Sequence, residues 1–228
     1  MTSDPDAPPV NPLPVGVVIL ALPMVILELA FLAGSEGIVG GPEAVGWRLA
    51  TIERYAFFVP LFQFAQETGQ WVPEILVRLL TYPFMHWGFT HMLMALVFLL
   101  ALGKMVGEVM GSRAVLLIFF GASILGALAL TVLTNDQQPL IGGFPGAYGL
   151  IGAYSFLLWM HARLTGGPTH QAFTLIAFLM GIQLLWALLF GAGQDWIADL
   201  AGFAGGFLLS FVVSPGGWRR VLGLLRQR

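Results

Sequence analysis

Six long apolar stretches constrain the fold of this chain more than any other feature. They lie at residues 13–33, 84–102, 114–134, 143–163, 171–190 and 196–214. A helix needs roughly 20 mostly apolar residues to cross about 30 Å of hydrocarbon. Because lipid offers no hydrogen-bond partners to open backbone groups, each of these segments has to be helical. The sequence therefore predicts an all-α, multi-pass membrane protein with six transmembrane helices in residues 13–214.

Composition agrees with a membrane protein and excludes several functions. The chain is 57% hydrophobic and only 10% charged, whereas soluble domains carry about 25% charged residues. A net charge of −2 gives no reason to expect nucleic-acid binding. Cysteine is absent, which excludes disulfide frameworks, thiolate metal sites and thiol nucleophiles.

The segments outside the apolar stretches have distinct characters. Residues 1–12 are acidic and proline-rich, which predicts a disordered tail. No basic region precedes the first apolar stretch, so we expect a retained span rather than a cleaved signal. Residues 34–83 carry Arg48, Arg54 and Arg78 among many aromatic residues. This long first loop is too interrupted to span, and it predicts amphipathic pieces that lie at the membrane interface.

The basic residues predict the orientation of the chain. Lys104 and Arg113 flank the second connection, Arg163 ends the fourth span, and residues 215–228 contain Arg219, Arg220, Arg226 and Arg228. In a six-span arrangement all seven lie on one side. The positive-inside rule then places both termini in the cytoplasm, which fits the inner membrane of a bacterium. Residues 215–228 resemble a basic amphipathic helix that contacts anionic lipid, although a stop-transfer charge cluster explains them equally well.

Four ionisable residues fall within or beside the predicted spans. These are Glu28, His86, His91 and Asp199, and such residues are functional candidates because their burial in lipid is costly. Glu28 lies near the outer end of its helix, where we expect a structural role or contact with lipid headgroups. For His86 we expect hydrogen bonds to loop carbonyls at the membrane surface.

Glycines mark two predicted helices that can approach each other closely. The stretch IGGFPGAYGLIGAY at residues 141–154 begins the fourth span, and Gly202, Gly205 and Gly206 flatten one face of the sixth. Small residues of this kind let two membrane helices pack at short distance. The sequence therefore predicts that the fourth and sixth spans are neighbours.

Three segments together resemble the rhomboid family of intramembrane serine proteases, over residues 78 to about 212. They are FMHWGFTHMLMALVFLLALGKMVGEVMGSR, GGFPGAYGLIGAY and ADLAGFAGGF, which are similar to the family's second, fourth and sixth spans. The resemblance implies a six-helix fold and, in active members, a Ser–His dyad with an oxyanion hole. It implies no metal and no other cofactor. The partners it implies are membrane lipids and the transmembrane helices of other proteins.

Carried over by position, the resemblance implies that the nucleophile and the base are both missing. The gapless match places Phe144 where the family has its serine and Pro145 where it has the following glycine. A shift by one residue would place Pro145 at the serine instead. The base histidine falls on Asp199. Loss of nucleophile and base removes the covalent mechanism.

The oxyanion positions are retained only in part. His91 matches one of the family's second-span histidines and His86 matches the other, but Ala95 stands where the family has asparagine. Alanine has no side-chain donor for an oxyanion. The serines elsewhere do not replace the lost nucleophile, because Ser123, Ser155, Ser210 and Ser214 all lie well inside other spans or toward their cytoplasmic ends.

The resulting hypothesis is a rhomboid pseudoprotease that binds transmembrane segments without cleaving them. Phe144 would fill the former active site, while the lateral gate between the second and fifth spans could still receive a helix. Three alternatives stay open: an active rhomboid endopeptidase, a structural subunit of a membrane complex, and a metal-dependent enzyme that uses His86, His91 and Asp199. We also expect a hydrogen bond or ion pair between Asp199 and His91.

Overall fold

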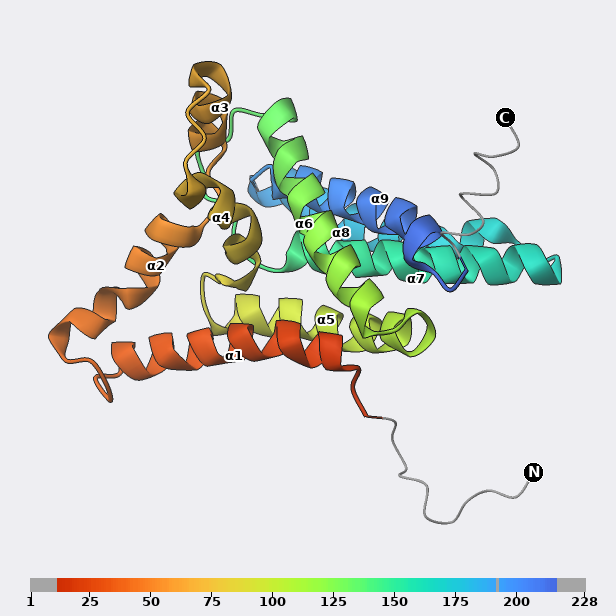
Figure 1. The fold of residues 1–228 in the computed structure, drawn as a ribbon, viewed down its shortest axis with the longest axis horizontal. Coiled ribbons are helices and arrows are strands. Elements are labelled where there is room, and N and C mark those ends of the chain that lie inside the picture. The colour runs from red at the N-terminus through yellow and green to blue at the C-terminus, as the bar shows by residue number, and fades with distance from the viewer. Residues whose placement is uncertain (1–11, 192, 217–228) are drawn as a thin grey trace, which may run out of the picture.

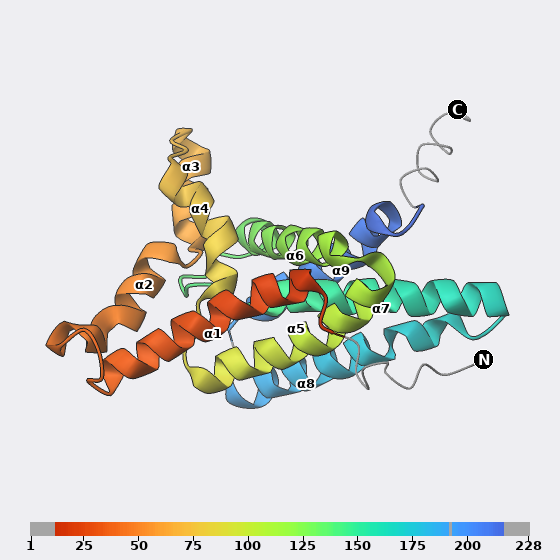
Figure 2. The same ribbon diagram turned by 60° about the horizontal axis from the view of Figure 1, so that its bottom comes forward.

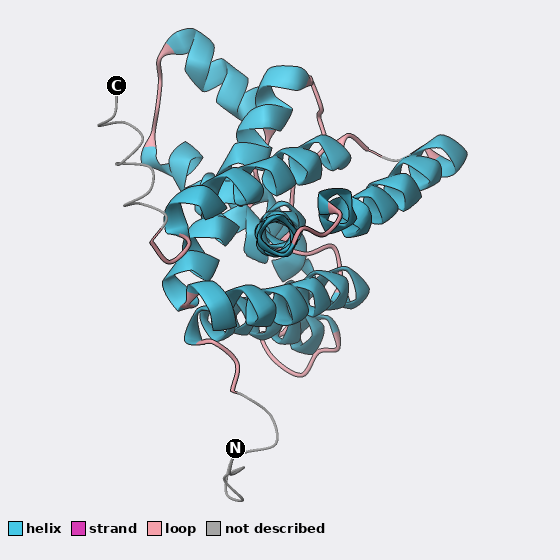
Figure 3. Cartoon of the chain, turned by 90° about the vertical axis from the view of Figure 1, so that its right-hand side faces the viewer, coloured by secondary structure: helices cyan, strands magenta, loops and turns pink. Residues whose placement is uncertain are grey.

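The computed structural model describes residues 12–191 and 193–216, and these residues form helices and loops with no strand (Figure 3). The α-helices are α1 (Val15–Ser35), α2 (Trp47–Tyr55), α3 (Val59–Thr68), α4 (Pro73–Thr81), α5 (Phe89–Met110), α6 (Ser112–Leu133), α7 (Phe144–Thr165), α8 (Thr174–Phe190) and α9 (Asp195–Val213). Three short 3₁₀ helices, η1 (Pro42–Gly46), η2 (Tyr82–Phe84) and η3 (Thr169–Phe173), join them. The all-α prediction is confirmed.

Within residues 12–191 and 193–216, five helical segments are long and apolar enough to cross a membrane: α1, α5, α6, α9 and the run of η3 and α8. Helix α7 has 22 residues but is less apolar, and 11 of its residues are buried. It packs against α5, α6 and α9, and a helix surrounded by protein does not need a lipid-facing apolar surface. The chain is therefore a multi-pass membrane protein with five candidate spans, and a sixth span at α7 stays a prediction.

The predicted bounds of the second span were wrong. Residues 84–102 were expected, whereas α5 covers Phe89–Met110 and only Gly111 separates it from α6. Lys104 consequently lies inside the helix, where its Nζ is 3.9 Å from a carboxylate oxygen of Glu108 one turn later. The predicted span ended before this charged pair because the prediction counted apolar residues. A pair of opposite charges at i and i+4 is nevertheless compatible with a helix.

The long first loop folds into the short helices α2, α3 and α4, which gather at the end of the bundle where α1 ends (Figure 1). None has more than 10 residues, so the prediction of short, non-spanning pieces is confirmed. Phe57 and Leu140 exchange two backbone hydrogen bonds of 3.2 and 2.9 Å. This pairing attaches the first loop to the segment that leads into α7.

Helices α7 and α9 pack backbone to backbone, as the glycine pattern predicts. A Cβ atom on Gly206 would collide with the backbone of Gly149, and one on Gly202 would collide with that of Pro145. Gly205 instead faces Leu125 of α6. The glycines of α9 therefore allow close packing against both α6 and α7. Figure 2 shows α6, α7 and α9 close together, with α8 beside them.

The two predicted tails cannot be compared with the structure in full. Residues 1–11 of the expected disordered tail and residues 217–228 of the expected basic tail lie outside the described residues. The four arginines at positions 219, 220, 226 and 228 are therefore not placed.

The glycine contact makes a direct stability prediction. Gly206→Ala should lower the free energy of unfolding by about 1–3 kcal/mol, because the added methyl meets backbone atoms that cannot rotate away. Gly181→Ala on α8 is the matched control, since a Cβ there has no atom within 4 Å. Thermal unfolding in detergent measures both variants. Equal stability of the two would show that α7 and α9 are not in close backbone contact.

Candidate functional site

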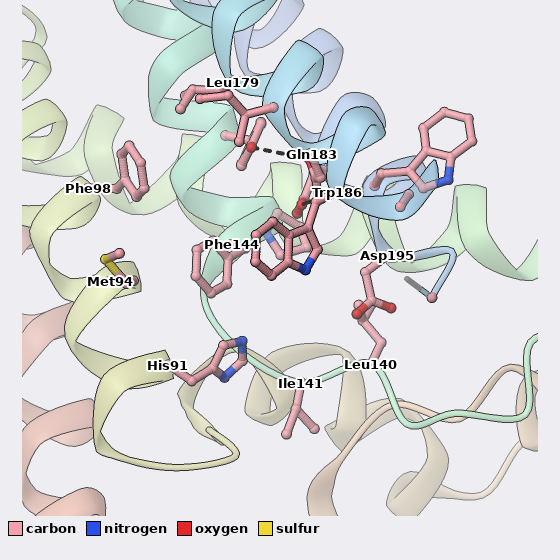
Figure 4. Close-up of a pocket in the computed structure, with 17 residues that line it drawn as sticks. His91, Met94, Phe98, Leu140, Ile141, Phe144, Leu179, Gln183, Trp186 and Asp195 are labelled. Carbon is pink, nitrogen blue, oxygen red and sulfur yellow. Dashed lines mark hydrogen bonds between the residues drawn. The ribbon is translucent and has the colours of Figure 1, made fainter. Parts of the chain in front are cut away.

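A cavity of about 680 Å³ lies at the beginning of α7, where the sequence placed the degenerate catalytic positions. Its walls come from α5, α7, α8, α9 and the loop before α7, and Figure 4 shows the side chains that line it. Its size falls within the range of about 300–1,000 Å³ for ligand pockets. The lining residues are His91, Met94, Phe98, Leu140, Ile141, Phe144, Pro145, Tyr148, Leu179, Ile182, Gln183, Trp186, Ala187, Gly193, Asp195, Trp196 and Asp199.

Phe144 is the first residue of α7, and its ring packs on the imidazole of His91 with the ring centroids 5.1 Å apart. Figure 4 shows the two rings next to each other at the cavity. Pro145 follows in the first turn, where the backbone N–H has no intrahelical partner and its loss costs little. Phe144 thus contributes an apolar ring to the wall of the cavity, and its role as a filling of a former active site stays a prediction.

The loop before α7 is held by hydrogen bonds to the segment before α5. The Gly142 N–H donates to the carbonyl of Tyr82 at 3.0 Å, and the hydroxyl of Tyr82 donates to the carbonyl of Ser123 at 2.8 Å. Gly142 has φ +99, and a Cβ there would lie 2.8 Å from Cε1 of His91. Only glycine combines this backbone conformation with this close approach.

His86 lies in the loop before α5 and is buried. Its Nε2 accepts a hydrogen bond from the Gly143 N–H at 3.5 Å, and it has a backbone hydrogen bond at Phe84. Burial lowers the pKa of His86 to about 3, so the ring is neutral at physiological pH. The expectation was of hydrogen bonds to loop carbonyls, whereas in the bond to Gly143 the ring accepts from an N–H. His86 thus supports the loop that carries Phe144.

His91 lies in the first turn of α5, and its Nδ1 accepts a hydrogen bond from the Trp87 N–H at 3.3 Å. The ring centroids of His86 and His91 are 5.4 Å apart. Ala95, one turn further along α5, is buried and presents only a methyl group. The family resemblance assigns oxyanion positions to His91 and Ala95. Of these two, His91 alone presents a polar atom to the cavity.

Asp199 does not bond to His91, so that prediction was wrong. Its Oδ2 accepts a hydrogen bond of 2.8 Å from Nε2 of Gln183, whose Oε1 accepts one of 3.3 Å from the Tyr148 hydroxyl. This chain of side chains, which we call the Gln183 clasp, joins α7, α8 and α9. Asp199 and His91 both line the cavity, but Gln183 supplies the donor that the carboxylate needs.

Glu28 is buried, with a side chain 2% exposed, and does not reach lipid headgroups. Arg48 of α2 donates two hydrogen bonds of 2.8 Å to its carboxylate and a third, of 2.9 Å, to the carbonyl of His86. The expectation of headgroup contact was wrong, and the alternative of a structural role fits. The pair joins α1 and α2 to the loop that carries His86.

Helix α8 is the most loosely packed wall of the cavity. Only Ile176 and Met180 of its 17 residues are buried. It packs mainly against η3, α7 and α9, and not to any comparable extent against α5. Residues Met94 and Phe98 of α5 and Leu179 and Ile182 of α8 all face the cavity. The space between α5 and α8 is therefore the side on which the cavity is least enclosed by helix packing.

Neither a nucleophile nor a metal site is found among the described residues at this cavity. Its lining contains no serine, threonine or cysteine, and Ser123, Ser155 and Ser210 are fully buried elsewhere. Within residues 12–191 and 193–216, no group of three histidine, aspartate or glutamate side chains is arranged to hold a metal ion.

Sequence reasoning missed Gln183, Tyr148 and the partner of Glu28. Gln183 had a usable signal, because it is a single amide in the middle of an apolar span, and such residues bond across helices. Arg48 had a weaker signal. It lies 20 residues after Glu28, in a loop whose course a sequence does not reveal, so no spacing of residues pointed to the pair.

The fold and the cavity define a class: an all-α, multi-pass membrane protein with a mostly apolar pocket between its helices that contains a few polar side chains. The rhomboid domain family matches residues 73–216, which is more than half of the 228 residues. This chain belongs to the rhomboid family.

Two curated relatives are similar to the same part of the chain. One, from Bacillus subtilis (strain 168), is named "Putative rhomboid protease YdcA" and is 28% identical over 136 residues, covering 59% of this chain and 66% of the relative. RHOMBOID-like protein 4 of Arabidopsis thaliana is 29% identical over 140 residues, covering 60% of this chain and 34% of the relative. The chain thus matches less than two thirds of the length of either relative.

The Gln183 clasp predicts which residues are energetically coupled. Gln183→Ala and Asp199→Ala should each destabilise the purified protein, and the double variant should lose less than the sum, by about 1 kcal/mol. Asp199→Ala combined with His91→Ala should be additive within about 0.5 kcal/mol. Thermal unfolding in detergent measures both cycles. Coupling to His91 with none to Gln183 would contradict the hydrogen bonds described above.

Proposed function

We propose that this chain is a rhomboid pseudoprotease, which binds transmembrane segments of other proteins without cleaving them. The observation that carries the proposal is the described lining of the cavity, which contains no serine, threonine or cysteine, and Phe144 or Pro145 stands where the family has its serine. Phe144 packs on His91. An apolar ring cannot attack a peptide carbonyl, so covalent catalysis has no first step here.

The surroundings of Phe144 support the same proposal. Asp199, at the position of the base, is engaged by Gln183, and Ala95 offers no donor to an oxyanion. Pro145 lacks the N–H that a residue beside the nucleophile would present. Four features of the catalytic arrangement are thus replaced, whereas the helix packing that encloses the cavity is kept.

Binding without cleavage is the function that the retained cavity supports best. Apolar side chains of α5 and α8 line it on the loosely packed side, where a transmembrane helix could enter from the lipid. We propose entry between these two helices, the family's lateral gate. The proposed setting is a bacterial inner membrane with both termini in the cytoplasm, and the proposed partners are lipids and transmembrane helices.

An active endopeptidase is the alternative that the name of the Bacillus subtilis relative favours. The two functions differ in one measurable respect, the presence of a reactive serine. Purified protein should neither react with a fluorophosphonate probe nor cleave a single-span rhomboid substrate, with an active rhomboid treated in parallel as the positive control. Labelling of any serine above background would defeat the pseudoprotease proposal.

The double variant Phe144→Ser with Asp199→His should also remain inactive. Pro145 still withholds an N–H beside the new serine, and Ala95 still gives no oxyanion donor. Loss of one such donor lowers the rate by about 10²–10³. Cleavage of the same substrate measures the outcome, and activity close to that of the positive control would show that the surrounding site is still competent.

Site-specific crosslinking tests binding at the gate. A photoreactive residue at Met94 or Ile182 should crosslink a co-reconstituted single-span protein, and excess unlabelled helix should reduce the yield. Leu117 of α6 is the matched control, because it is equally apolar and exposed but lies outside the cavity lining. Equal yields from all three positions would indicate random contact in the bilayer and would contradict entry between α5 and α8.

A further inference from the structure

The polar groups of the cavity have a common chemical character. Its ionisable lining side chains are His91, Tyr148, Asp195 and Asp199, and none of its described lining residues is lysine or arginine. Figure 4 shows Asp195 and Gln183 on the same side of the cavity as Trp186. An otherwise apolar cavity thus contains two carboxylates and no positive charge from its described lining.

Asp199 bonds to α8 and also lines the cavity, so a purely structural role does not account for its whole position. It is 4% exposed, and its Oδ2 is bonded to Gln183. Its other oxygen, Oδ1, accepts no hydrogen bond from the described residues, and it is not one of their fully buried polar atoms, so it is open to the cavity. A carboxylate oxygen open to a mostly apolar cavity can accept a hydrogen bond from a donor or pair with a cation.

Aromatic rings surround the two carboxylates. Trp186 of α8, Trp196 of α9 and Phe144 of α7 line the same cavity, and the faces of such rings attract cations electrostatically. Carboxylates together with indole rings form the environment that ammonium and guanidinium groups prefer. The chemistry of the lining therefore favours a positively charged ligand over a neutral or anionic one.

We propose that the cavity selects transmembrane segments that carry a lysine or arginine near their outer end, a partner class that rests on the proposed function. The basic side chain enters between α5 and α8 and pairs with Asp199, and Asp195 at the mouth attracts it. Asp199 lies one helical turn, roughly 6 Å, beyond Asp195 along α9. The preferred basic position is therefore one to two turns inside the outer end of the bound helix.

The Gln183 clasp explains how a basic side chain could bond to Asp199. Gln183 is a neutral donor to Asp199, and an ammonium or guanidinium group is a stronger one. A basic side chain can bond Oδ1 directly or replace Gln183 at Oδ2. Replacement would free α8 from α9 on the side where helix packing is weakest, so binding of a basic segment and opening of the gate are coupled.

Designed single-span helices test the proposal. Purified protein in liposomes is titrated with fluorescent leucine–alanine helices that carry one lysine at successive positions, and binding is followed by energy transfer. The matched helices carry methionine at the same positions. The lysine helix with its charge one to two turns from the outer end should bind about tenfold more tightly than its methionine partner.

Variants assign the preference to the carboxylates. Asp199→Asn retains an oxygen that can accept from Gln183 but removes the charge, so it should abolish the lysine preference, with the lysine and methionine helices binding equally. Asp195→Asn should reduce the preference only in part. A lysine preference that persists in both variants would overturn the proposal, as would equal binding of lysine and methionine helices to the wild type.

The remaining outcomes separate this proposal from the one on which it rests. If neither helix binds, the proposed function itself fails. If both bind equally and the binding is lost when α5 and α8 are crosslinked, the proposed function stands and the basic preference is wrong. An ammonium headgroup has the same chemistry as lysine. If phosphatidylethanolamine in the liposomes removes the preference that phosphatidylglycerol liposomes allow, the site belongs to lipid and the proposal is overturned.

Discussion

The close backbone contact between α7 and α9 is the interaction on which the rest of the structure depends. Gly149 and Gly206 meet where any Cβ would collide, and Gly202 meets Pro145 in the same way. This contact brings the start of α7, with Phe144, beside the first turns of α9, with Asp199. Without it, Phe144 and Asp199 would not face one cavity. In the proposed function, this contact preserves the scaffold of a catalytic site whose chemistry has been lost.

Side chains at the ionisable positions form hydrogen bonds that hold helices together. Glu28 and Arg48 join α1 and α2 to the carbonyl of His86, and neutral His86 accepts from the loop that begins α7. Asp199 holds α8 through Gln183. Polar groups in lipid are costly unless they are paired, so each link also explains why its residues are tolerated there.

Much of the fold could be predicted from the sequence, because apolar length and glycine spacing are local signals. They indicated the helices and the contact between α7 and α9, and the spaced motifs placed Phe144 and Asp199 at one site. The partner of Asp199 could not be predicted in this way. It depends on the rotation of α8, which brings Gln183 to the carboxylate, and no local pattern reports that rotation. The end of α5 was missed because Lys104 and Glu108 interrupt its apolar run.

The central claim is that the cavity binds a transmembrane helix and leaves it intact. The most direct test follows one labelled single-span protein in liposomes with the purified chain, and records binding by energy transfer and chain length by mass spectrometry. Saturable binding that a cavity substitution such as Ile182→Trp weakens, with the bound helix at full length throughout, is the result that this account predicts. A shortened product that accumulates with time, or the absence of saturable binding, would contradict it.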